Sequence, residues 1–366
     1  MYIKFIIRTG LLILALLSFA VLCACGKPDT TKKSALVIST KPHTAESDVN
    51  TVSPEEVTKN KDSFLYGSDT YIILNNDNTV IKGEGAVFEN SVLTISQGGT
   101  YHLSGELSDG QIYVNSSDAK ENVRLHLNGV SVSCKDDASL YVGSSPKGTV
   151  IYLCDDTVNS LSDVADKSQD EKSKQSTGVI YSENELTVDG EGVLDIRAEY
   201  GKGVFAKKNV NINEGYVHIA ATLDNGIYCE DSINMTDGTV VVYGSADTKK
   251  EAVSYAGSFS LSDGKILALG NVGSLQSMTG TDDVRVLTYS YSEPVKGLNV
   301  ITEEDGEVVV GFEAYDGLKN MFFAGEELDS DEAYTLCKAG KIIGEEFNKV
   351  YFEGEYTDGV PVGVLS

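Results

Sequence analysis

An internal repeat in the middle of the chain constrains its fold more than any other feature. Four segments align on their turn glycines, Gly192, Gly215, Gly238 and Gly264, which are 23, 23 and 26 residues apart. Two apolar residues spaced two apart precede each glycine, and two more follow it. A period of two predicts strands, because successive side chains of a strand point to opposite faces. Three short strands per turn predict a parallel β-helix, with positive φ at the turn glycines.

The apolar residues of successive repeats fall into columns when the repeats are stacked. One column contains Val188, Ile212, Met235 and Leu261. A β-sandwich, the alternative all-β fold, has no such constant register. We therefore predict that Ile212 faces the interior, between Val188 and Met235.

The N-terminus resembles a bacterial lipoprotein signal peptide. Lys4 and Arg8 precede an apolar run, which ends in the string LCAC at Cys25. A charged start, a short apolar run and a small residue before the cleavage site are typical of secretion. We predict a signal peptide over residues 1–24 and a diacylglyceryl group on Cys25. Two acyl chains hold a protein stably, which places this one at the outer face of the cell membrane.

Composition divides the rest of the chain into three parts. Residues 25–65 are polar and predict a disordered tether. Residues 66–290 form the predicted β-helix, interrupted by a charged stretch between Ser162 and Thr177. Residues 291–366 alternate like antiparallel strands, and we predict that they cap the open end of the helix.

The net charge of −26 disfavours nucleic acid and anionic membrane surfaces as partners. Four further cysteines, which contain no CxxC pair, are Cys134, Cys154, Cys229 and Cys337. Their spacing disfavours a zinc site. Disulfides are possible in a secreted chain, and free thiols stacked in the solenoid are the alternative that we favour.

Five segments together resemble a known bacterial family. They are GGTYHLSGELSDGQIYVN (98–115), VRLHLNGVSVS (123–133), LCDDTVNSLSD (153–163), DGEGVLDI (189–196) and DNGIYCEDSINMTDG (224–238). In this order they resemble carbohydrate-binding-domain-containing proteins over about residues 84–348. The resemblance implies a right-handed parallel β-helix, binding of plant-type polysaccharides such as cellulose or pectin, and bound calcium. It does not imply catalysis.

An aromatic residue follows the inward aliphatic residue of the third strand in five rungs. These residues are Tyr113, Tyr141, Tyr181, Phe205 and Tyr228. Strand alternation turns them outward, and rungs are ~4.8 Å apart, so they predict a flat aromatic stripe. Because sugar rings stack on aromatic rings, we predict that this stripe binds carbohydrate. The alternative is that the tether or the C-terminal cap covers the rings.

One turn has the oxygen ligands of a calcium site. Asp224 and Asn225 lie beside a glycine, and Glu251 follows one rung later. Lys202 and Lys250 stand where the resemblance implies carboxylates, so an ordinary polar turn is the alternative. Bound calcium would let a negative chain approach polygalacturonate.

No constellation typical of an enzyme is evident. A hydrolase needs two carboxylates at a defined separation, and a lyase needs a calcium-binding carboxylate cluster beside a cationic base. The mature arginines share no column and the histidines lie singly on strands; they are Arg124, Arg197, Arg285, His102, His126 and His218. We predict a non-catalytic, lipid-anchored protein that binds cellulose or pectin. The alternatives are a structural or adhesive β-helix with a protein partner, and a cryptic polysaccharide lyase.

Overall fold

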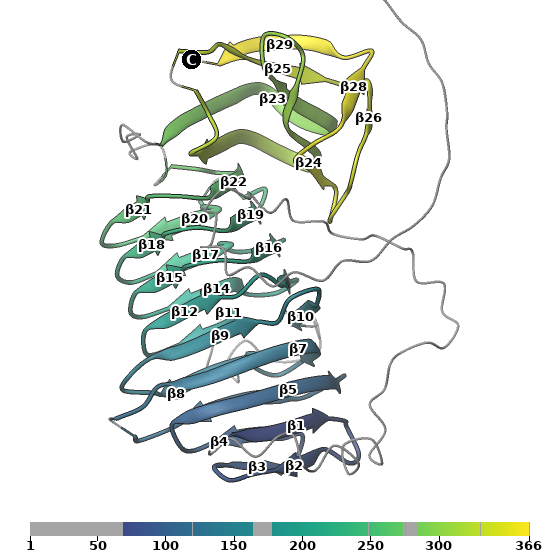
Figure 1. Cartoon of the computed structure of the whole chain (residues 1–366). Helices are drawn as coiled ribbons and strands as arrows, with labels where there is room; N and C mark the ends of the chain where they lie inside the picture. Colours follow the sequence, from purple (N-terminus) through teal and green to yellow (C-terminus); the bar gives the residue numbers. More distant parts are fainter. Residues whose placement is uncertain are drawn as a thin grey trace, which may run out of the picture. The chain divides into compact units, whose positions relative to one another are not determined.

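The computed structural model describes residues 69–365, except 119, 164–177, 248, 274, 276–283 and 330. The regular elements of this part are β-strands, most of them in stacked rungs (Figure 1). The predicted signal peptide, Cys25 and the tether lie outside the described residues. Among the residues described, no helix has the length and apolarity needed to cross a membrane.

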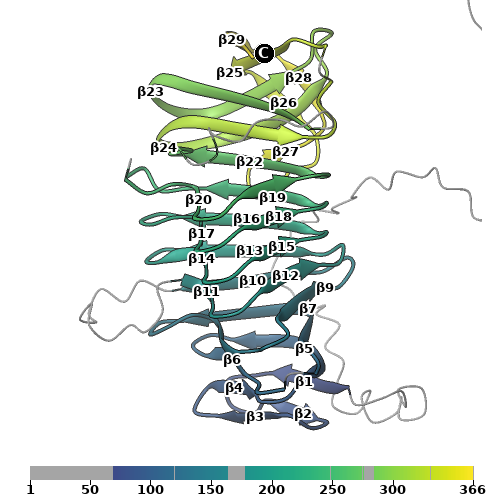
Figure 2. The same cartoon turned by 90° about the vertical axis from the view of Figure 1, so that its left-hand side faces the viewer.

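The rungs present three parallel sheets, seen from two sides in Figures 1 and 2. Face one contains β9 (Thr149–Leu153), β12 (Leu186–Asp189), β15 (Val210–Ile212), β18 (Ile233–Met235) and β21 (Phe259–Leu261). Face two contains β10 (Val158–Asp163), β13 (Val193–Ala198), β16 (Tyr216–Ala221), β19 (Thr239–Tyr243) and β22 (Lys265–Gly270). Face three contains β4 (Val92–Ile95), β6 (Gln111–Asn115), β8 (Leu140–Ser144), β11 (Gly178–Ser182), β14 (Lys202–Ala206), β17 (Ile227–Cys229) and β20 (Val253–Tyr255).

Two longer strands contribute to both faces one and two. β7 (Val123–Cys134) pairs with β9 through its first half and with β10 through its second half. β5 (Gly99–Leu107) runs parallel to β7. Gly105 and Gly129 adopt φ of 93° and 69° between the two halves. A β-carbon at Gly105 would lie 2.3 Å from the Leu74 carbonyl oxygen, so this corner requires glycine.

The predicted parallel β-helix is confirmed by the register of its interior. Ile212 is 3% exposed and is paired in register with Val188 and Met235. Positive φ is also found at Gly215, Gly238 and Gly264. In the first repeat it falls on Gly190 instead of Gly192, so that detail of the prediction is wrong. Here the chain reverses two residues earlier.

Antiparallel strands close both ends of the stack. β2 (Val80–Lys82) and β3 (Ala86–Glu89) pair antiparallel with β1 (Thr70–Leu74) and β4. At the other end β24 (Val308–Gly325) pairs antiparallel with β22, the last rung of face two (Figure 1). The predicted antiparallel cap is therefore confirmed.

Six further strands lie with β24 in the C-terminal part of the chain. They are β23 (Arg285–Thr302), β25 (Tyr334–Lys338), β26 (Lys341–Ile343), β27 (Val350–Tyr351), β28 (Glu355–Thr357) and β29 (Val360–Leu365). The predicted boundary at residues 290 and 291 falls inside β23. All four cysteines named above are free thiols, and all but Cys154 are buried.

Candidate glycan-binding surfaces

The five predicted aromatic residues form one continuous column on face three. Each ring lies in register with the next, and successive ring centroids are 5.4, 4.9, 5.2 and 5.3 Å apart. Thr94 and Ser254 occupy the flanking rungs, so the column is confined to five strands. We call Tyr113, Tyr141, Tyr181, Phe205 and Tyr228 the five-ring column.

The rings of this column do not lie flat. Neighbouring ring planes meet at angles between 41° and 84°, as in edge-to-face aromatic packing. Tyr181 is 5% exposed, whereas the other four rings are half-buried. The outer surface is therefore ridged, because each ring optimises its contact with its neighbour. The described C-terminal segment packs elsewhere, since Phe347 contacts Tyr216 on face two.

Two lysines lie along the five-ring column. The Lys207 ammonium is 2.8 Å from a Glu183 carboxylate oxygen and 5.7 Å from the Tyr181 ring centroid. Hydrogen bonds from Lys207 and from the Tyr181 hydroxyl lower the pKa of Glu183. The Lys202 ammonium lies 5.5 Å from the Phe205 ring and 5.4 Å from the Tyr228 ring. The column therefore combines apolar ring surface with ammonium groups that are held in place by ion pairs.

The residues predicted to bind calcium do not fit a metal ion. One carboxylate oxygen of Asp224 is 3.2 Å from the Lys202 ammonium, and the other is 2.9 Å from that of Lys250. Burial raises the pKa of Asp224, but these lysines and the Asn225 amide outweigh it and lower the pKa. The Asn225 side chain donates to the Glu251 carbonyl. Two ammonium groups thus occupy the position that a cation requires.

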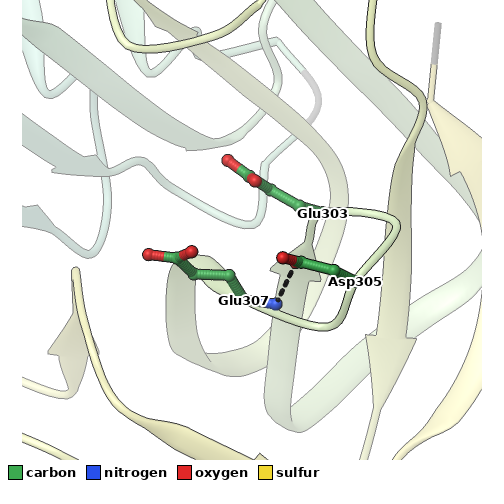
Figure 3. Close-up of side chains that lie close together, drawn as sticks. All are labelled: Glu303, Asp305 and Glu307. Atoms are coloured by element: carbon green, nitrogen blue, oxygen red, sulfur yellow. Dashed lines mark hydrogen bonds between the residues drawn. The ribbon is translucent and has the colours of Figure 1, made fainter. Parts of the chain in front are cut away.

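A second group of carboxylates lies in the turn between β23 and β24. Glu303, Asp305 and Glu307 bring one oxygen each within 4.8 Å of one another (Figure 3). An Asp305 oxygen accepts a hydrogen bond from the Glu307 backbone amide. Burial and the neighbouring carboxylates raise the pKa of Glu303. Exposed acidic turns are common without an ion in an acidic chain, so we assign no metal here.

A second column of rings lies on face one. Tyr71, His102, His126 and Tyr152 occupy successive strands, with centroids 4.6, 4.8 and 4.6 Å apart. We call these residues the four-ring column. The prediction that His102 and His126 lie singly is wrong, because the long strands β5 and β7 place them side by side. The recurring strings YHL, LHL and IYL were the signal in the sequence.

A basic pocket lies beside the four-ring column. It has a volume of about 470 Å³, and Lys120, Arg124 and Lys147 contribute its positive charge. Gly99, Thr100, Glu121 and Asn122 complete the lining. Arg124 belongs to the same strand and the same outward face as His126. Of the three arginines in the described part of the chain, Arg197 is paired with Asp195, and Arg285 donates to the carbonyls of Asp329 and Glu332.

The third histidine belongs to a buried polar cluster on face two. His218 Nδ1 is 2.8 Å from an Asp195 oxygen, which also accepts a hydrogen bond from Asn348 at 2.9 Å. Burial raises the pKa of Asp195, but His218 and Arg197 outweigh it and lower the pKa. Asn348 and Phe347 cover the cluster, so it stabilises the packing of the C-terminal segment.

Part of this chain is similar in sequence to known proteins. The family model described as carbohydrate-binding domain-containing protein matches residues 89–286. A protein of that name from Acetivibrio thermocellus is 29% identical over 130 residues, which are 35% of this chain and 45% of the relative. The matched region thus spans less than half of that relative. A solved structure titled polysaccharide lyase-like protein from C. thermocellum, a gadolinium derivative, has a TM-score of 0.44 and 21% identity. The similarity covers 54% of this chain and 90% of that one.

Proposed function

The chain belongs to the family of carbohydrate-binding domain-containing proteins, and we propose that it binds an extended polysaccharide of the cellulose or pectin type without cleaving it. We further propose that it does so at the cell surface, held by a lipid on Cys25. The five-ring column carries the proposal, because five aromatic rings recur in register on one face of a rigid solenoid.

The spacing of the column suits a polymer with a regular repeat. Rungs are ~4.8 Å apart, so the five rings extend over roughly 19 Å. Apolar sugar faces stack on the exposed parts of the rings, and each contact contributes about 1 kcal/mol, as aromatic pairs do. Lys202 and Lys207 lie beside the rings, where their ammonium groups can donate to ring hydroxyls or to a uronate.

Replacing the accessible rings tests this proposal. The triple variant Tyr141→Ala, Phe205→Ala, Tyr228→Ala keeps the buried Tyr181 that supports the rungs. We expect it to bind cellohexaose and insoluble cellulose at least tenfold more weakly. A tenfold loss of affinity corresponds to about 1.4 kcal/mol, and the three lost ring contacts together supply more than that. Calorimetry and cellulose pull-down measure the loss, and circular dichroism confirms the fold.

A matched variant keeps the rings and removes only hydroxyls. Tyr113→Phe, Tyr141→Phe and Tyr228→Phe together should retain most of the affinity if stacking supplies it. If the wild type and the alanine variant bind with equal affinity, the rings of the column contribute to packing and not to binding. This result would also favour a structural β-helix with a protein partner.

Chelation tests the predicted calcium. Because Lys202 and Lys250 bind both oxygens of Asp224, we expect EDTA to leave cellulose and polygalacturonate binding unchanged. A selective loss of polygalacturonate binding would restore a calcium bridge to the proposal.

The lipid anchor is tested separately in cells. Cys25→Ala should abolish incorporation of labelled fatty acid and leave the protein uncleaved or shed, because the acyl chains supply the attachment. Fractionation and labelling measure this, with Cys23→Ala as the matched control. A processed, membrane-bound Cys25→Ala protein contradicts the assignment.

A further inference from the structure

We propose that face one carries a second binding site, for a saccharide that bears a negatively charged group. The four-ring column contacts the sugar ring, and Lys120, Arg124 and Lys147 bind the anion. The site shares with the proposed function only the premise that this protein binds saccharides, since it lies on another face and uses other residues.

The pocket is positive in a chain whose net charge is −26. Arg124 is half-buried on β7, whereas Lys120 and Lys147 extend from the turns before β7 and β9. None of these three cations forms an ion pair with a residue that the structure describes. Unpaired cations converging on a pocket offer hydrogen bonds to a carboxylate, sulfate or phosphate, which are stronger than neutral ones.

The four-ring column lies at a suitable distance from this pocket. Arg124 and His126 are two residues apart on one strand, which corresponds to roughly 7 Å. The Tyr71 and His102 rings are nearly parallel, with 9° between their planes, and the His126 and Tyr152 rings differ by 24°. The two rings of each stacked pair cover each other's faces, so the column presents ring edges, with imidazole nitrogens and tyrosine hydroxyls, to the outside. A sugar that hydrogen-bonds to the edge of His126 can therefore direct its charged substituent toward Arg124.

Negative groups lie both within the site and around it. Asp69 pairs with His102 at 3.1 Å, and Glu121 lines the pocket together with the three cations. Asp189 follows Tyr152 on the next rung, and burial together with Asp155 raises the pKa of that tyrosine. Other charged neighbours are Asp118, at the turn before β7, Glu185, beside Gly148, and Lys82, paired with Tyr71. Asp69 and Asp189 disfavour an anion toward the two ends of the column, which leaves the part near Arg124.

His126 makes this site sensitive to pH. Burial, together with His102 and Arg124, lowers the pKa of His126, so this imidazole is neutral at pH 7. A bound anion favours the protonated imidazole, and by reciprocity protonation favours the bound anion. Binding should therefore tighten as the pH falls from about 7 to about 5.5, where a carboxylate keeps its charge.

Calorimetry on the purified full-length protein tests the site with polygalacturonate, dextran sulfate and neutral cellohexaose. We expect Arg124→Gln with Lys147→Gln to weaken polyanion binding at least about tenfold, as the loss of hydrogen bonds to charged groups predicts. Cellohexaose binding should stay unchanged. The matched control, Lys319→Gln with Lys341→Gln, alters the net charge equally on the C-terminal strands and should keep full affinity.

Measuring binding at two pH values distinguishes binding at this site from general electrostatic attraction to the protein. His126→Gln removes a side chain that contacts the sugar, so it should bind polygalacturonate more weakly than the wild type at pH 7, and it should also lose the tightening between pH 7 and about pH 5.5. The tighter polyanion identifies the anion as carboxylate or sulfate, and the variants must weaken that one. Absence of binding to either polyanion, or equal binding by wild type and the Arg124 variant, overturns the proposal. Loss of cellohexaose binding in the triple alanine variant of the five-ring column tests the proposed function, and it does not change the result expected for polyanion binding at face one.

Discussion

The five-ring and four-ring columns use the same scaffold to make surfaces of different chemistry. On face three the rings are phenol and phenyl groups in edge-to-face contact, and their lysines are paired with Glu183 or Asp224. On face one, two imidazoles lie between two tyrosines, and the adjacent cations are unpaired among the described residues. Stacking in register thus determines where a column lies, while residue type determines what it can bind. One protein can therefore present two separate surfaces that differ in the chemistry they offer to a saccharide.

The largest effect is expected from a charge placed in the interior beneath one column. Ile212→Asp buries an unpaired carboxylate between Val188 and Met235, which should cost about 3 kcal/mol or more. Because rungs interact mainly with their neighbours, hydrogen exchange should increase first around β15. The four-ring column, on earlier rungs, should keep its protection longer.

Ile212→Val is the control for this variant and should cost about 1 kcal/mol without local opening. Uniform loss of protection over all rungs of Ile212→Asp would show that both columns belong to one cooperative unit.

A smaller difference is expected when one ring is removed from each column. Tyr181 is 5% exposed, so Tyr181→Ala should lower the free energy of unfolding by about 3 kcal/mol. Tyr152 is half-buried, and Tyr152→Ala should cost about 1 kcal/mol. Urea unfolding measures both, with the corresponding phenylalanine variants as controls. Equal losses would mean that the two columns contribute alike to stability.

The smallest effect is a difference in the pH range over which each column affects stability. The lowered pKa of His126 means that the unfolded chain binds more protons below pH 6.5, so stability falls as the pH drops through that value. Glu183 has a lowered pKa, so its contribution is present above pH 4.5 and is lost as the pH falls further. Solvent screening keeps this second contribution small, because a third of the Glu183 side chain is exposed.

Thermal melting of His126→Gln and Glu183→Gln across this pH range checks the assignment. Each variant should flatten only its own part of the profile. A His126→Gln profile that follows the wild type between pH 7 and the lowered pKa would contradict the role given to that residue.

The solenoid and the last three rings of the five-ring column were predictable because they obey a constant period. Val188, Ile212 and Met235 recur every 23 or 24 residues, and Tyr181, Phe205 and Tyr228 follow the same spacing. Tyr113 and Tyr141 lie 28 and 40 residues before the next ring, and the aliphatic residue before each of them identified their place in the column. The orientation of the rings was not predictable, since it depends on how neighbouring rings pack.

The four-ring column escaped prediction although its spacing is close to that of the repeat. His102, His126 and Tyr152 are 24 and 26 residues apart, and Tyr71 precedes His102 by 31. The strands that carry the histidines bend across two faces, so the three-strand pattern of the middle rungs does not apply to them.

Contacts between distant segments were also beyond sequence reasoning. The Asn348 side chain bonds Asp195, 153 residues earlier, and no periodic pattern relates the two. The ion pairs of Asp224 could be anticipated only in part. The sequence places Lys202 and Lys250 beside the predicted calcium turn, but the stacking of the rungs on either side brings both ammonium groups to Asp224.

The antiparallel strands at the two ends have a consequence for how such a protein can change. β2 and β3 at one end occupy hydrogen-bonding edges of β1 and β4, and β24 at the other end occupies that of β22, where further parallel strands would pair. A rung inserted within the stack leaves these antiparallel strands in place. Duplication of one 23-residue turn, such as that between Gly215 and Gly238, would insert a rung whose neighbours already match it. Each insertion would add one ring to the five-ring column, so the length of the proposed binding surface could evolve in steps of a single rung.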